Sequence, residues 1–184
     1  MPDLSTARIG VLPAVITTRA VTLTPATPRA RFILRGVDAV AAAGTAFGVA
    51  IPTKPLTSAR HGDHAALWLG PDEWLLQAPA VETVVLYQHL TTALQGLACA
   101  LVDISHRQTA LIVKGPKAAS LLNAGVPLDL SLAAFPSGMV TRTIFEKAEI
   151  VLWRLDAETF HVEVWRSFAP YLLALLEAAD HGLA

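Results

Sequence analysis

Apolar and polar positions follow regular spacings along most of the chain after residue 30. Short apolar runs predict strands at 31–35 and 110–114, each followed by a glycine and then by a stretch that favours a helix. Two hairpins are predicted, at 67–76 and at 152–164, and each leads into a helix. One more strand is predicted at 98–104, after the first of these helices.

The last helix has the clearest pattern in the chain. Ser167 is a favourable N-cap and Gly182 a favourable stop signal. Between them, apolar residues recur at a helical spacing that predicts one buried stripe: Phe168, Tyr171, Leu172, Leu175, Leu176 and Ala179. The strand before this helix, at 160–165, alternates apolar residues with polar or aromatic ones, which predicts a half-exposed strand.

The two halves of this pattern resemble each other. Aligned on Gly36 and Gly115, both run strand, helix, hairpin and helix, and only the first half ends with a closing strand. We therefore expect an α+β fold of duplicated β-α-β-β-α(-β) units, forming a single domain over 31–184. Its two similar halves are expected at about 31–104 and 107–184. The missing strand of the second half is expected from residues 15–23.

The beginning of the chain and one internal region lack this regularity. Residues 1–30 contain four prolines and one β-like patch, and they predict a proline-punctuated arm that includes an edge strand. The region 43–62 is expected to be a loop, because glycines and prolines interrupt it.

Composition narrows the possible classes of protein. The 184 residues are 53% hydrophobic and 16% charged, with 14 basic and 15 acidic side chains. A chain this apolar can bury a substantial core, which excludes a disordered protein. Its nearly balanced charge argues against binding to nucleic acid or to an anionic membrane. A mean hydropathy of +0.49 predicts that some apolar surface stays exposed and associates with another protein.

The single cysteine and the first residues indicate a cytoplasmic location. Cys99 has no partner for an intrachain disulfide or a cysteine-based metal site. Asp3 stands where a signal peptide would have a basic region, and no apolar stretch is long and continuous enough to span a bilayer. We expect a cytoplasmic protein that makes no contact with a membrane.

Metal and cofactor motifs are weak in this sequence. His61 and His64 lie three residues apart, but Gly62 disfavours a helix there and no third ligand follows at a suitable spacing. They are expected to be solvated loop histidines. The glycine patterns of dinucleotide sites and phosphate loops are absent, so this chain alone is not expected to bind flavin or nicotinamide.

The polar segment Val102–Thr109 is the strongest candidate site, since it joins two predicted strands. Asp103, His106 and Arg107 could form a proton-transfer group. Alternatively, Asp103 and Ser105 could bond the backbone of a tight connection, while His106 and Arg107 face a partner or solvent. We favour this second, structural or partner-facing interpretation, which assigns no catalytic, cofactor or metal residue to the chain.

The four tryptophans all stand at strand positions of the two predicted hairpins: Trp68, Trp74, Trp153 and Trp165. Most are expected in the core or in cross-strand pairs. An exposed tryptophan would mark an interface with another protein.

Several short motifs follow one another in a fixed order over roughly residues 30–180. They are Leu69-Gly70-Pro71-Asp72-Glu73-Trp74-Leu75-Leu76, Val102-Asp103-Ile104-Ser105-His106-Arg107, Lys114-Gly115-Pro116, Leu128-Asp129-Leu130, Phe135-Pro136, Thr141-Arg142-Thr143 and Arg166-Ser167-Phe168. In this order they closely resemble the gamma-subunit family of heterotetrameric sarcosine oxidases. The stretch from Asp103 to Pro116 also resembles the glycine-cleavage aminomethyltransferases.

The resemblance implies a fold like the amino-terminal domain of the aminomethyltransferases. It also implies a non-catalytic subunit, with alpha, beta and delta subunits as partners, in a flavoenzyme that oxidatively demethylates sarcosine with one-carbon transfer to tetrahydrofolate. FAD, FMN, NAD, zinc and tetrahydrofolate are implied in the other subunits and not in this chain. The acidic residue on which folate-dependent relatives rely is absent from 138–145. A stand-alone folate-binding aminomethyltransferase-like protein remains the alternative interpretation.

Overall fold

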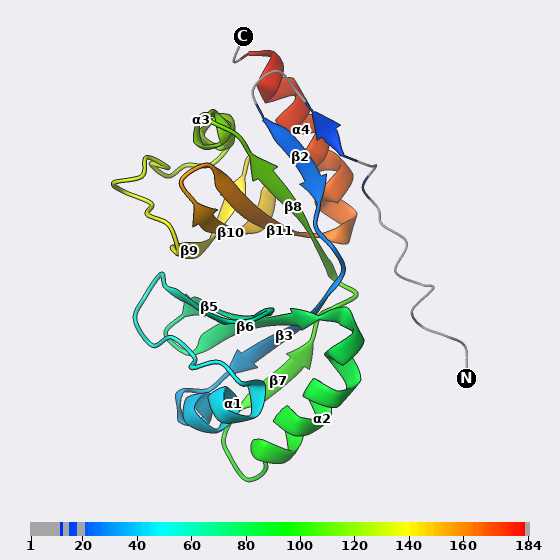
Figure 1. Ribbon diagram of the computed structural model, residues 1–184, viewed down its shortest axis with the longest axis vertical. Coiled ribbons are helices and arrows are strands. Elements are labelled where there is room, and N and C mark those ends of the chain that lie inside the picture. The colour runs from blue at the N-terminus through cyan, green and yellow to red at the C-terminus, as the bar shows by residue number, and fades with distance from the viewer. Residues whose placement is uncertain (1–11, 13–14, 18–20, 183–184) are drawn as a thin grey trace, which may run out of the picture. The chain divides into compact units, whose positions relative to one another are not determined.

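The computed structural model describes residues 12, 15–17 and 21–182, which group into two compact units. Unit 2 comprises Pro28–Ser105 and Gly138–Thr141, and unit 1 comprises the described residues of the remaining chain. The chain passes between the units at Ser105 and His106, inside the polar segment described above. Each unit carries helices and an antiparallel sheet (Figure 1), which confirms the predicted α+β class.

The sheet of unit 2 has the strand order β4-β5-β6-β3-β7. Its elements are β3 (Arg29–Arg35), η1 (Val37–Ala39), α1 (Val40–Phe47), β4 (Ser58–His61), β5 (His64–Gly70), β6 (Glu73–Pro79), η2 (Ala80–Glu82), α2 (Thr83–Ala93) and β7 (Ala100–Asp103). Helices α1 and α2 pack against one face of this sheet (Figure 1). The core between them contains, among others, Phe32, Leu34, Phe47, Trp74, Leu76, Leu86 and Leu90.

The second sheet has the strand order β1-β2-β8-β11-β10-β9 and belongs to unit 1, except that the first two residues of β9 fall in unit 2. Its elements are β1 (Ile16–Thr17), β2 (Thr22–Pro25), β8 (Gln108–Lys114), α3 (Ala118–Asn123), β9 (Val140–Phe145), β10 (Ala148–Asp156), β11 (Thr159–Trp165), η3 (Arg166–Phe168) and α4 (Ala169–His181). In the pairing of β8 with β11, Gln108 lies opposite Trp165. This register places Arg107, just before β8, beside the end of β11.

The two sheets repeat one connectivity, and the beginning of the chain completes the second copy. Strand β7 pairs with β3 in unit 2, and β2 pairs with β8 at the corresponding edge in unit 1, with Thr22 opposite Lys114. Strand β2 therefore supplies the strand that the second half of the sequence lacks, at a position that only partly overlaps the expected 15–23. Residues 1–11, 13, 14 and 18–20 of the predicted arm lie outside the described residues.

The predicted loop over 43–62 is wrong at both of its ends. Helix α1 continues to Phe47, and β4 occupies Ser58–His61. Gly48 adopts a left-handed conformation with φ of 76° and forms the C-cap of α1. A glycine in this conformation ends a helix without preventing one.

The second half contains three further differences from the sequence predictions. Ser167 is not the N-cap of α4, because the turn η3 precedes that helix and Phe168 takes the N-cap position. The buried residues of α4 are Ala169, Leu172, Leu173 and Leu176, so Phe168 and Tyr171 stand outside the buried stripe. Strand β11 is buried at six of its seven positions. Its polar residues tolerate burial because His161 and Glu163 pair at 2.8 Å.

Candidate functional site

Asp103 and Ser105 hold the end of β7 against β3. The backbone N–H of Ser105 donates to Asp103 Oδ1 at 2.8 Å, and the Ser105 hydroxyl donates to the same oxygen at 2.5 Å. The backbone N–H of Arg31 in turn donates to Ser105 Oγ at 2.9 Å. These bonds are local turn and strand contacts, so they occupy the carboxylate in a structural role.

Arg107 makes a different kind of contact, in unit 1. Its guanidinium lies over the indole of Trp165, 5.0 Å from the ring centroid, and its carbonyl accepts from the N–H of Arg166 at 3.0 Å. Both Arg107 and His106 are exposed. The candidate acid and the candidate cation are thus engaged in separate contacts, which disfavours a proton-transfer role for this segment.

Two more aromatic side chains lie along the chain from Trp165 at intervals of three residues. Trp165, Phe168 and Tyr171 are 39%, 41% and 40% exposed. Phe168 meets Tyr171 edge to face, with centroids 6.3 Å apart. Phe168 and Tyr171 are three residues apart in the helical backbone of η3 and α4 and therefore share one side, while Trp165 is the last residue of β11, directly before η3. We call Arg107, Trp165, Phe168 and Tyr171 the aromatic ridge.

The other three tryptophans are placed in the interior or in a cross-strand pair. Trp74 and Trp153 are buried, and Trp68 is half-buried opposite Trp74 in the pairing of β5 with β6. Trp74 also donates its ring N–H to the carbonyl of Pro52 at 2.7 Å. Only Trp165 meets the expectation of an exposed tryptophan.

Unit 2 has an exposed apolar surface of its own at the start of α2. Val81 is 91% exposed, and Val84 and Val85 are also exposed. Their spacing of three and four residues places them on one face of η2 and α2. We call this set the valine face. It carries apolar area but no charged side chain among its three members.

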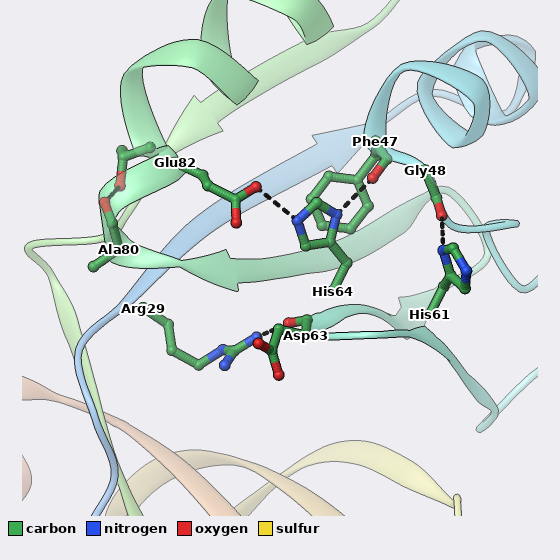
Figure 2. Close-up of polar contacts among 9 residues, drawn as sticks. Arg29, Phe47, Gly48, His61, Asp63, His64, Ala80 and Glu82 are labelled. Atoms are coloured by element: carbon green, nitrogen blue, oxygen red, sulfur yellow. Dashed lines mark hydrogen bonds and ion pairs between the residues drawn. The ribbon is translucent and has the colours of Figure 1, made fainter.

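A hollow of about 480 Å³ lies at the end of α1 in unit 2. His64 lines this hollow together with Phe47 and Glu82. Its Nδ1 bonds the carbonyl of Phe47 at 2.8 Å, and its Nε2 lies 2.9 Å from Glu82 Oε2 (Figure 2). The imidazole also stacks on the ring of Phe47, with centroids 4.8 Å apart. Nearby, His61 Nδ1 bonds the carbonyl of Gly48 at 3.2 Å. The prediction of solvated loop histidines is therefore wrong for His64, which is half-buried at the start of β5, and His61 is exposed but lies at the end of β4 and not in a loop.

Both histidines bond backbone carbonyls at the C-terminal end of α1. A carbonyl oxygen can only accept, so Nδ1 of each ring carries the proton, and each ring covers a carbonyl at the end of α1. Both nitrogens of His64 are engaged, which leaves neither for a ligand. Over the described part of the chain, no group of three or more His, Cys, Asp or Glu side chains is placed to hold a metal ion.

Among the described residues, no helix is both long and apolar enough to cross a bilayer.

Sequence comparison identifies close relatives of one kind. The profile of the "Sarcosine oxidase, gamma subunit family" matches residues 36–181. Gamma subunits of sarcosine oxidase from Arthrobacter sp and Corynebacterium sp. strain P-1 are 33% and 32% identical over 124 and 107 residues. These alignments cover 66% and 58% of this chain, and only 60% and 52% of the relatives' own length.

Comparison with solved structures also finds a chain of a sarcosine oxidase. A chain of the heterotetrameric sarcosine oxidase from Corynebacterium sp. U-96, solved with pyrrole 2-carboxylate, matches with a TM-score of 0.83 at 29% identity. That match covers 97% of this chain and 92% of the other. Aminomethyltransferase T of the glycine cleavage system from Bartonella henselae matches with a TM-score of 0.66 over 87% of this chain and 46% of the other. At 17% identity, this second likeness shows a shared fold alone.

Proposed function

Because the chain belongs to the sarcosine oxidase gamma subunit family, we propose that it serves as a non-catalytic subunit of a heterotetrameric sarcosine oxidase. Its partners in this proposal are the alpha, beta and delta subunits. The assembled enzyme oxidatively demethylates sarcosine and passes the one-carbon unit to tetrahydrofolate. FAD, FMN, NAD, zinc and tetrahydrofolate are held by the other subunits in this proposal.

The observation that carries this proposal is the apolar area that both units leave uncovered. Unit 1 exposes the aromatic ridge, and unit 2 exposes the valine face. Aromatic residues and arginine are enriched at protein interfaces, and contiguous exposed apolar patches mark association surfaces. The low charged fraction of 16% agrees with a chain that works against other chains, since ordinary globular domains have about 25%.

The geometry of the polar groups supports a non-catalytic role. Asp103 is occupied by Ser105, Arg107 by Trp165, and His64 by Phe47 and Glu82. Asp103, Arg107 and His64 are thus each committed to a contact that positions backbone or holds two elements together. Such fixed contacts suit a scaffold better than a proton relay.

Co-expression tests this function. The tagged chain is produced with and without the alpha, beta and delta subunits of the same organism's sarcosine oxidase, and the purified material is analysed by size exclusion with light scattering. We expect one complex that contains all four chains and oxidises sarcosine, and we expect no sarcosine oxidation by the chain alone. A chain that stays monomeric beside an assembled, active complex of the other three would refute the proposal.

A further inference from the structure

The aromatic ridge combines a cation with three exposed rings on one unit of the chain. Arg107 is exposed, yet its guanidinium is held over Trp165. We propose that this ridge docks onto an acidic, partly apolar surface of another subunit, and that Arg107 binds a carboxylate there. This inference rests on the proposed function, and it names which surface of the chain is used and the chemistry of its partner.

The stacked position of Arg107 prepares it for a carboxylate. Stacking on an aromatic ring restricts the side chain while the N–H groups at the edge of the guanidinium stay available as donors. A guanidinium held in this way loses less conformational freedom when a carboxylate binds it in a bidentate manner. Within the described residues, no carboxylate forms an ion pair with Arg107 that would compete for those donors.

The charged residues next to the ridge in the sequence favour a negatively charged partner surface. The two stretches that carry the ridge, 105–109 and 165–171, contain His106, Arg107 and Arg166 as their ionisable basic residues. They contain no aspartate or glutamate. Stretches that carry basic side chains and no carboxylate are complemented by negative charge on a partner, which steers association and disfavours other basic surfaces.

The rings supply the affinity that the charge alone lacks. Trp, Tyr and Arg dominate the residues that contribute most to protein association, and they do so when they are packed together and shielded from water. Trp165 and Arg107 are already in contact, and Phe168 and Tyr171 already form an edge-to-face pair. The ridge is therefore largely ordered before it binds. The valine face lacks a fixed charge, and it serves as the comparison surface.

Charge reversal at Arg107 tests the inference in the assembled enzyme. We would measure the affinity of the chain for the purified complex of the other three subunits, over a range of salt concentrations, for the wild type, Arg107→Glu, Arg107→Lys and Phe168→Ser. Lys54→Glu, at an exposed lysine of unit 2, provides the matched charge change elsewhere. Thermal unfolding of each free variant verifies that the fold is intact.

Arg107→Glu is expected to weaken binding by roughly 30-fold or more, as for residues at the centre of an interface. Arg107→Lys should lose less, because it keeps the charge and gives up the fork geometry. Phe168→Ser should also weaken binding, while Lys54→Glu should change it by less than about twofold. The affinity of the wild type should fall with salt, and that of Arg107→Glu should respond less.

The outcomes separate this inference from the proposed function. Normal assembly of Arg107→Glu and Phe168→Ser would overturn the ridge as the docking surface and leave the subunit role standing. If Val81→Ser with Val84→Ser abolishes binding instead, the valine face is the docking surface. If the free chain dimerises through the ridge and the dimer is lost in Arg107→Glu, the occupant is a second copy and the inference is wrong. Failure of the wild type to bind the other subunits would refute both proposals.

Discussion

The guanidinium of Arg154 lies over the ring of Phe160, 4.7 Å from its centroid, inside unit 1. The same group donates to the carbonyls of Leu130 and Phe135 at 2.9 and 2.8 Å. Burial lowers the pKa of Arg154 below its ordinary value, although the charge of Asp156 opposes this shift. One buried cation thus fixes two points of the long connection between α3 and β9.

Replacing Arg154 with methionine should destabilise the chain by about 2–4 kcal/mol, because buried carbonyls lose a charged donor. Urea unfolding followed by circular dichroism would measure the change. Arg142→Met is the control, since the Arg142–Glu149 pair is long at 3.9 Å and partly exposed. It should cost less than about 1 kcal/mol. Equal losses in the two variants would contradict the structural role of Arg154.

Gly125 lies against the ring of Phe145, and a Cβ atom at this position would come within 2.6 Å of the ring. The backbone N–H of Glu146 also donates to the carbonyl of Gly125 at 2.9 Å, which limits how far the two segments can separate. Gly125→Ala should therefore lower stability by roughly 1–3 kcal/mol, as expected for overpacking. The smaller ring-free side chain in Phe145→Leu should recover part of that loss in the double variant. Purely additive losses in a double-mutant cycle would argue against this contact.

Asp156, at the turn between β10 and β11, makes the free energy of unfolding depend on pH. The backbone N–H of Glu158 donates to Asp156 Oδ1 at 2.9 Å, and this bond, with others from Thr159, lowers the pKa of Asp156 below 3.8. A folded pKa below the unfolded one adds stability above pH 3.8, and that stability is lost as pH falls through the folded pKa. Unfolding free energies measured from pH 7 to pH 3 should fall less steeply for Asp156→Asn. Identical slopes would contradict this assignment.

The two histidines at the end of α1 should differ in their effect on stability. His64→Ala removes a bond to Phe47, a contact with Glu82 and a stacked ring, so it should cost roughly 1–2 kcal/mol. His61→Ala removes one exposed bond of 3.2 Å and should cost less than about 0.5 kcal/mol. Thermal and urea unfolding would rank the two variants. The reverse order would show that the stack on Phe47 does not hold the helix end.

Tetrahydrofolate is expected to bind this chain more weakly than about 10 μM, which corresponds to roughly 7 kcal/mol. The reason is the lack of any acidic side chain over 138–145, a stretch that includes strand β9. Titration calorimetry would measure the binding, with a folate-dependent aminomethyltransferase as the positive control. Tighter binding would favour the stand-alone folate-binding alternative.

Most elements of the fold can be predicted from the sequence because the spacing of apolar residues within each segment specifies a strand or a helix. The apolar runs and helical spacings correspond to β3, the two hairpins, α2, β8 and α4. The errors arise where a residue has a role that periodicity does not reveal. Gly44 falls in the predicted loop, yet it lies within α1, where a Cβ atom would come 3.1 Å from the carbonyl of Val49. It is a site of close backbone approach inside a helix.

The contacts of the candidate site were partly accessible to sequence reasoning. The bonds between Asp103 and Ser105 join residues two apart, so the local pattern suggests them. The stacking of Arg107 on Trp165 depends on the register of β8 with β11, which no local pattern specifies. The helical spacing predicts Phe168 and Tyr171 in the buried stripe of the last helix, because spacing alone does not tell which of two adjoining apolar stripes meets the sheet. Their exposure follows from the packing of Ala169, Leu172 and Leu176 instead.

The pairing of β2 with β8 has a consequence for the order of events during synthesis. The ribosome releases Thr22 early, but its partner Lys114 emerges only after the whole of Pro28–Ser105 has been made. The middle of the chain can thus fold before β2 finds its partner. When β8 emerges, β11 has not yet been made, so β2 is the one of its two neighbouring strands that is already available. An open strand edge invites pairing with other nascent chains. Strand β2 can therefore cover one edge of β8 while the rest of the second sheet is still being synthesised.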